Sequence, residues 1–172
     1  MLILGIDPGS TRVGYGLIKK NKNDLSLIKC GLLKIKSKDK AQRLLEIEKD
    51  FSSLIARTKP DLVILEKLFF MKNMKTALEV AQSRGVLTLL ATKSKIPLLE
   101  FSPSEIKIGV TGYGRADKKA IAKMAAKILK VPEFKVVDDI TDAIAAAITG
   151  AHTVMQKSEC MRILRINNYS HR

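Results

Sequence analysis

The sequence has few aromatic residues, no tryptophan and only two cysteines, Cys30 and Cys160. The two cysteines lie in unrelated contexts, which excludes a disulfide framework and a Cys-x-x-Cys metal site and favours a reducing, cytoplasmic location with free thiols. No apolar run reaches the roughly 18–20 residues of a membrane span, so no membrane partner is expected. Met1 leads into LILGID without a basic region or a small-residue cleavage site, so no secretory signal is predicted.

Acidic residues are scarce relative to basic ones. The 172 residues include 31 Lys and Arg against 17 Asp and Glu, a net charge of +14. This surplus predicts an anionic partner, with nucleic acid as the first choice and a merely solubilising basic surface as the alternative. With 46% hydrophobic and 28% charged residues, the composition is that of a globular protein. The length fits one domain with a sizeable core.

The spacing of apolar residues predicts three strands followed by alternating helices and strands. Alternating stretches separated by turns in the first 36 residues predict an antiparallel meander, and helical spacing then alternates with short apolar runs. The predicted strands are 2–6, 12–18, 25–35, 62–65 and 97–101, and the predicted helices are 41–57, 75–92, 104–108, 118–129 and 139–155. This order predicts an α/β, ribonuclease H-like fold, with a mixed five-stranded sheet and helices on both faces.

Four of the scarce acidic residues fall at the ends of predicted elements. Asp7 ends the first strand and Glu66 ends the fourth, while Asp139 and Asp142 share one face of the first turn of the last helix. The first and fourth strands are parallel neighbours in this order, so their carboxyl ends meet at the edge where α/β sheets bind ligands. Taken singly, these residues also suit a turn, a solvated strand end or a helix cap. Only convergence in one pocket explains why all four carboxylates are expected at the same edge of the sheet.

Converging carboxylates repel one another unless protons or cations neutralise them. Mg²⁺ prefers hard oxygen ligands, and two such ions about 3.5–4 Å apart stabilise both the attacking and the leaving oxygen of a phosphoryl displacement. We therefore expect Asp7, Glu66, Asp139 and Asp142 to hold two Mg²⁺ ions per subunit, and the same oxygen ligands would accept Mn²⁺. No cysteine or histidine cluster competes for this role.

A series of short motifs runs through residues 1–155. The motifs are LGIDPGS (4–10), GYG (14–16), EKLF (66–69), Asn73, Ala77, Leu78, Gln82, RGV (84–86), Lys107, GYG (112–114), KK (118–119), DITDA (139–143), AAAIT (145–149) and His152. In order and spacing this series resembles the RuvC family of Holliday junction resolvases, the crossover junction endodeoxyribonucleases. Asp138 departs from the family pattern: the D-x-x-D-A spacing selects Asp139 with Asp142, and the role of Asp138 stays open.

The resemblance implies a homodimer that nicks two strands of a four-way DNA junction symmetrically, with Mg²⁺, leaving 5′-phosphate and 3′-hydroxyl ends. It also implies branch-migration motor proteins as partners. Residues 1–155 would form the nuclease domain and residues 156–172 a basic tail. The matched catalytic positions are Asp7, Glu66, Asp139, Asp142, Lys107 and Lys118, and Phe69 matches an aromatic position implicated in stacking on junction bases.

Basic residues are concentrated between 107 and 135, where eight lysines and arginines face two acidic residues. We expect Arg115, Lys119 and Lys123 to contact DNA phosphates, which makes affinity fall steeply with salt. A solvated helix face is the alternative for such lysines. The predicted helix 75–92, with Leu78 and Leu89, is either the dimer interface or a helix packed on the sheet.

Three other functions are compatible with parts of the sequence. Residues 5–10 resemble the phosphate-binding hairpin of sugar-kinase and actin-like ATPases, but those proteins need two lobes and a second glycine-rich motif. A basic DNA-binding module without activity leaves the four carboxylates unexplained. A ribonuclease H-like nuclease for RNA–DNA hybrid satisfies fold and carboxylates equally, and only the family resemblance favours junctions.

Overall fold

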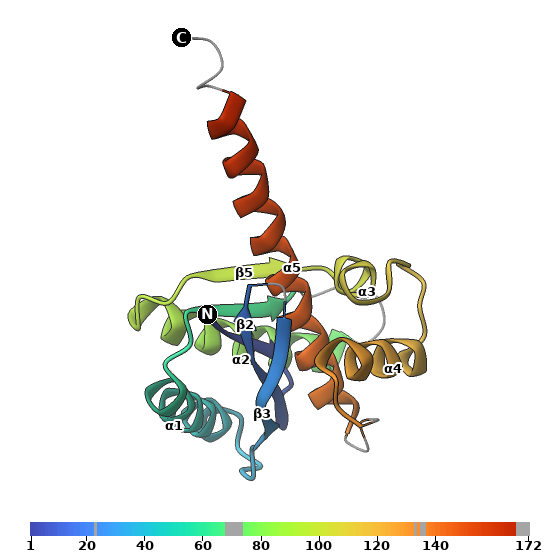
Figure 1. Cartoon of the computed structure of the whole chain (residues 1–172). Coiled ribbons are helices and arrows are strands. Elements are labelled where there is room, and N and C mark those ends of the chain that lie inside the picture. The colour runs from blue at the N-terminus through green and yellow to red at the C-terminus, as the bar shows by residue number, and fades with distance from the viewer. Residues whose placement is uncertain (23, 68–73, 133, 135–136, 168–172) are drawn as a thin grey trace.

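The computed structural model describes the chain except residues 23, 68–73, 133, 135–136 and 168–172, and for residues 74–76 and 155–167 it describes the backbone alone. The elements are β1 (Leu2–Asp7), β2 (Arg12–Asn21), β3 (Asp24–Lys34), α1 (Lys40–Thr58), β4 (Leu62–Glu66), α2 (Met74–Lys93), β5 (Leu98–Phe101), α3 (Pro103–Thr111), α4 (Lys118–Leu129) and α5 (Asp138–Asn167). Their order along the chain is the predicted one (Figure 1). Among the described residues, no helix is long and apolar enough to cross a membrane.

The five strands form one mixed sheet in the order β3-β2-β1-β4-β5. β1 pairs antiparallel with β2 and parallel with β4, as predicted. Because Ile6 pairs with Leu65, the next residues along the two strands, Asp7 and Glu66, end side by side at the carboxyl edge of the sheet. The strand pairing therefore brings together two acidic residues that lie far apart in the sequence.

Helices cover both faces of the sheet, which confirms the predicted ribonuclease H-like arrangement. Successive strand residues point to opposite faces. Leu4 and Ile6 of β1 are fully buried in a core formed with α1 and α2, whereas Ile3 is fully buried in a second core formed with α3, α4 and α5. Asp7 follows the alternation of Ile3 and Gly5, so its side chain lies on the α5 face of the sheet.

Two glycines allow α5 to lie directly on the sheet. A Cβ atom on Gly5 would lie 2.6 Å from the amide nitrogen of Ala147, and one on Gly14 would lie 2.5 Å from the carbonyl carbon of Asp139. Both distances are far inside van der Waals contact, so neither position accepts a larger residue at this helix–sheet spacing. The close approach places the first turn of α5 against the end of β1, beside Asp7.

Two helices end three or more residues later than predicted. α5 continues to Asn167 rather than ending at Met155, because no glycine or proline follows Gly150 to break it, and its C-terminal part extends away from the sheet (Figure 1). α3 continues past Ile108 to Thr111 and ends where Gly112 adopts the left-handed conformation, with φ 74°.

We expect Gly14→Ala to push α5 away from the sheet and to lower the free energy of unfolding by about 1–3 kcal/mol, the usual cost of overpacking. Chemical denaturation measures this loss. Gly114→Ala is the control, because a Cβ there would meet Ile108 at 3.4 Å, an ordinary contact. Equal stability of the two variants would contradict the close-approach argument.

Candidate active site

Asp7 lies at the centre of the acidic cluster. Its pKa is raised from the usual 3.8 to about 8, mainly because the carboxyl group is buried, and next because of the charges of Glu66, Asp142 and Asp139. Lys118 acts in the opposite direction. All four carboxylates named by the sequence analysis therefore share one electrostatic environment at the carboxyl ends of β1 and β4 and the start of α5.

Glu66 faces both acidic and basic neighbours. Burial and then the charge of Asp142 raise its pKa from 4.5 to about 7, while Lys118 and Lys107 lower it. Burial also raises the pKa of Asp142, and the charge of Lys118 lowers it. A cavity of about 210 Å³ is lined by these four residues together with Pro103, Ile106, Ile121 and Ala145. The two lysines predicted to be catalytic thus line the same cavity as two of the carboxylates.

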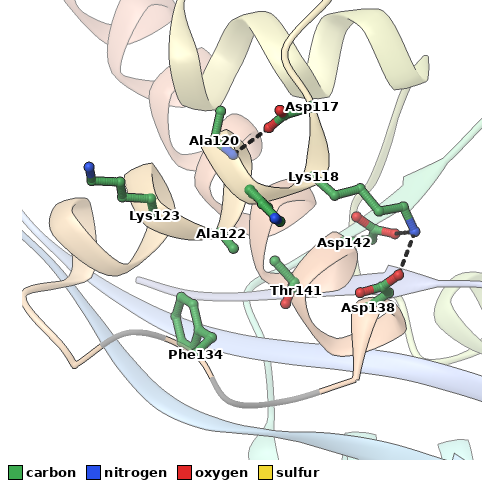
Figure 2. A pocket seen from close by; sticks show the side chains of 10 residues that line it. Asp117, Lys118, Ala120, Ala122, Lys123, Phe134, Asp138, Thr141 and Asp142 are labelled. Atoms are coloured by element: carbon green, nitrogen blue, oxygen red, sulfur yellow. Dashed lines mark hydrogen bonds and ion pairs between the residues drawn. The ribbon is translucent and has the colours of Figure 1, made fainter.

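The first turn of α4 positions Lys118. Asp117 caps this helix, and its Oδ1 accepts a hydrogen bond of 2.7 Å from the amide nitrogen of Ala120 (Figure 2). The Lys118 ammonium then lies 2.9 Å from Asp138 Oδ2 and 3.8 Å from Asp142 Oδ2. The hydrogen bond to Asp138 is the main reason that the pKa of Lys118 is raised. Lys118 therefore bridges α4 and the start of α5.

Arg12 is a site residue that the sequence analysis missed. Its Nε lies 3.1 Å from Asp139 Oδ2, so a positive charge at the start of β2 faces the first turn of α5. The two groups form an ion pair but not a hydrogen bond. Asp139 Oδ2 is buried and has no hydrogen-bond donor among the described residues. The signal available in the sequence was the antiparallel pairing of β1 and β2, which brings the start of β2 close to Asp7.

The structure describes three of the four residues predicted to bind DNA. Lys119 and Lys123 line a groove of about 640 Å³ that also contains Lys118, Phe134 and Thr141 and reaches Asp138 and Asp142 (Figure 2). Arg115 is exposed in the turn before α4 and lines neither this groove nor the smaller cavity. Phe69 lies outside the described residues, so its predicted contact with bases stays a prediction.

The donor set suits a hard divalent cation. The candidate ligands are all carboxylates, burial and mutual repulsion raise the pKa values of three of them, and Asp139 Oδ2 accepts no hydrogen bond from the residues that the structure describes. Among the described residues, no three side chains of Asp, Glu, His or Cys are arranged to hold a metal ion as they stand. The four carboxylates fit a divalent ion in charge and in ligand chemistry, and holding it would require a rearrangement of their side chains.

The sheet order and the acidic edge define a ribonuclease H-like protein. The sequence profile of the family described as crossover junction endodeoxyribonuclease RuvC matches residues 3–150. The chain is 43% identical over 148 residues to a protein of that name from Petrotoga mobilis, covering 86% of this chain and 91% of the relative. It is 37% identical over 169 residues to the Fusobacterium nucleatum protein of that name, covering 97% and 88%. The chain belongs to the RuvC family, which confirms the resemblance found in its motifs.

Solved structures agree with this assignment. The chain is similar to Thermus thermophilus RuvC in complex with Holliday junction substrate, with a TM-score of 0.83, 27% identity, and coverage of 91% of this chain and 96% of the other. The yeast mitochondrial Holliday junction resolvase Ydc2 matches with a TM-score of 0.67 at 16% identity, which supports the fold alone. Family membership separates this chain from the ATPases that share its first hairpin.

The raised pKa values predict a stability that falls with pH in the absence of metal. Between the unfolded value near 3.8 and the folded value of about 8, Asp7 binds more proton in the folded protein than in the unfolded chain. The free energy of unfolding therefore decreases as the pH rises through this window. Asp7→Asn should remove on the order of 1–3 kcal/mol of that decrease. Denaturant titrations at pH 5 and 8 in a chelator measure it, and parallel pH profiles for the two proteins would contradict the burial of Asp7 among acidic groups.

Proposed function

We propose that the chain is a structure-specific endonuclease that resolves four-way DNA junctions by paired, symmetric nicks. The observation that carries the proposal is the convergence of Asp7, Glu66, Asp139 and Asp142 at one sheet edge, in a chain that belongs to the RuvC family. The junction as substrate is supported by the Thermus thermophilus relative, whose structure contains a Holliday junction.

The four carboxylates are the residues that would hold two Mg²⁺ ions, or Mn²⁺ in their place. Bound divalent ions supply charge stabilisation to the attacking and the leaving oxygen of an in-line displacement. Lys107 and Lys118 line the cavity beside Glu66 and Asp142, where their ammonium groups stabilise negative charge on the phosphate as the transition state forms. The products are 5′-phosphate and 3′-hydroxyl ends.

The basic groove guides the cleaved strand to the carboxylates. Lys119 and Lys123 of α4 line the groove that reaches Asp142, and their charges suit backbone phosphates. Arg115 lies in the preceding turn, exposed to solvent, and adds to the same positive field. Phe69 is proposed to stack on a junction base, on the family resemblance alone.

A homodimer supplies the two sites that two nicks require. Leu78, Gln82, Gly85 and Leu89 form an exposed stripe along α2 at helical spacing, and the two leucines are 65% and 53% exposed. These leucines therefore do not pack on the sheet, and the stripe suits a two-fold contact between copies. Branch-migration motors as partners, a cytoplasmic location and a domain boundary near residue 155 rest on the sequence alone.

Asp7→Asn should lower the rate of junction nicking by at least about 10²–10³-fold, because the central carboxylate no longer carries charge for the ions. Junction affinity should stay the same or increase, because a negative charge near the phosphates is removed. Nicking and binding assays use a synthetic four-way junction, a linear duplex and an RNA–DNA hybrid, with and without Mg²⁺.

The matched control is Glu48→Gln, which makes the same charge change at an exposed position of α1, the helix on the opposite face of the sheet from the site. This variant should nick like the unmodified protein. Proportional losses of binding and nicking in Asp7→Asn would count against its role at the metal site. If the protein cleaves the RNA–DNA hybrid in preference to the four-way junction, the junction is not its substrate.

A further inference from the structure

Asp138 is the acidic residue that the family pattern does not use, yet it makes the shortest contact with Lys118. Its Oδ2 accepts a hydrogen bond of 2.9 Å from the Lys118 ammonium, whereas Asp142 Oδ2 lies 3.8 Å from the same nitrogen (Figure 2). The Asp138 side chain is 67% exposed and that of Asp142 is 31% exposed. The ammonium thus lies between a solvated carboxylate at the rim and a less exposed one nearer the centre.

The ion pair contributes little to stability, because both partners are mostly exposed and the pair is screened by water and salt. The ion pair instead determines the position of the Lys118 positive charge. The carboxylates that attract Lys118 are Asp138, Asp142 and Asp7, from α5 and β1. Two of these three are proposed metal ligands, so the ammonium competes with a divalent ion whenever it leaves Asp138.

We propose that Asp138 is a positioning residue that holds the Lys118 ammonium at the rim of the acidic cluster and so keeps it from moving closer to Asp142 than 3.8 Å. This inference rests on the proposed function, since it assigns Asp142 to the ion site. Without Asp138, the nearest of these carboxylates to the ammonium is Asp142, already within 4 Å. An ammonium paired with Asp142 neutralises a ligand charge and occupies an oxygen that the divalent ion needs.

The same arrangement gives Lys118 a role both without and with a bound divalent ion. With no divalent ion present, its charge partly offsets the repulsion felt by Asp7 and Glu66, whose pKa values it lowers. Because Asp138 anchors the ammonium outside the central carboxylates, the ammonium would leave the oxygen atoms of Asp7 and Asp142 available to hold a divalent ion. The ammonium then remains beside the cavity where the phosphate arrives.

A double-mutant cycle on Mn²⁺ affinity, measured by isothermal titration calorimetry without DNA, tests the proposal. Asp138→Asn should weaken Mn²⁺ binding about fivefold, because it frees the ammonium to pair with Asp142. Lys118→Met should bind Mn²⁺ at least as tightly as the unmodified protein. In the Lys118→Met background, Asp138→Asn should change the affinity by less than about twofold.

The control is Asp24→Asn. Asp24 also pairs with a lysine, Lys130, at 2.9 Å, and both side chains are 75% exposed. The variant therefore removes the same charge from a similar ion pair. This pair lines neither the cavity nor the groove. It should leave Mn²⁺ affinity unchanged. Asp138→Glu keeps a carboxylate at the position and should restore affinity, which separates positioning from misfolding.

Three results would overturn the inference. An equal loss of affinity from Asp138→Asn with and without Lys118 would mean that Asp138 acts on the ion directly, and no loss at all would mean that it positions nothing. Either result leaves the proposed nuclease function intact. Absence of saturable Mn²⁺ binding in the unmodified protein would overturn both this inference and the ion site on which it rests.

Discussion

Electrostatic repulsion among carboxylates at one sheet edge is the constraint on which the rest of the site depends. Asp7, Glu66 and Asp142 are shielded from water and close to one another, and each has a raised pKa for that reason. A folded protein keeps such a cluster only when cations or protons neutralise it. Arg12 and Lys118 supply positive charge at its two ends, and the proposed divalent ions supply the remainder.

The fold creates this crowding through a few local features. Parallel pairing of β1 with β4 sets Asp7 beside Glu66, and the small residues of β1 and β2 let α5 approach closely enough to add Asp139 and Asp142. Caps on α3 and α4 then fix the helices that carry Lys107 and Lys118. The chemistry is therefore built from the ends of elements, while the core beneath it stays apolar.

The parts of this arrangement that follow from chain order and residue periodicity could be predicted from the sequence. Strand order placed Asp7 beside Glu66, and three-residue spacing placed Asp139 with Asp142 on one helix face. The partners of Arg12 and Asp138 could not be predicted, because they depend on how far long side chains reach between elements. The ends of α3 and α5 were missed for a different reason: helix termination depends on capping and breaking residues, which periodicity does not report.

The site depends on the proposed neutralisation of the acidic edge by divalent ions. A crystal structure of the protein with Mn²⁺, located by anomalous scattering, measures this most directly. We expect two ions about 3.5–4 Å apart, which Asp7, Glu66, Asp139 and Asp142 would hold. Ions bound only elsewhere on the protein, with no ion at Asp7, would contradict this expectation.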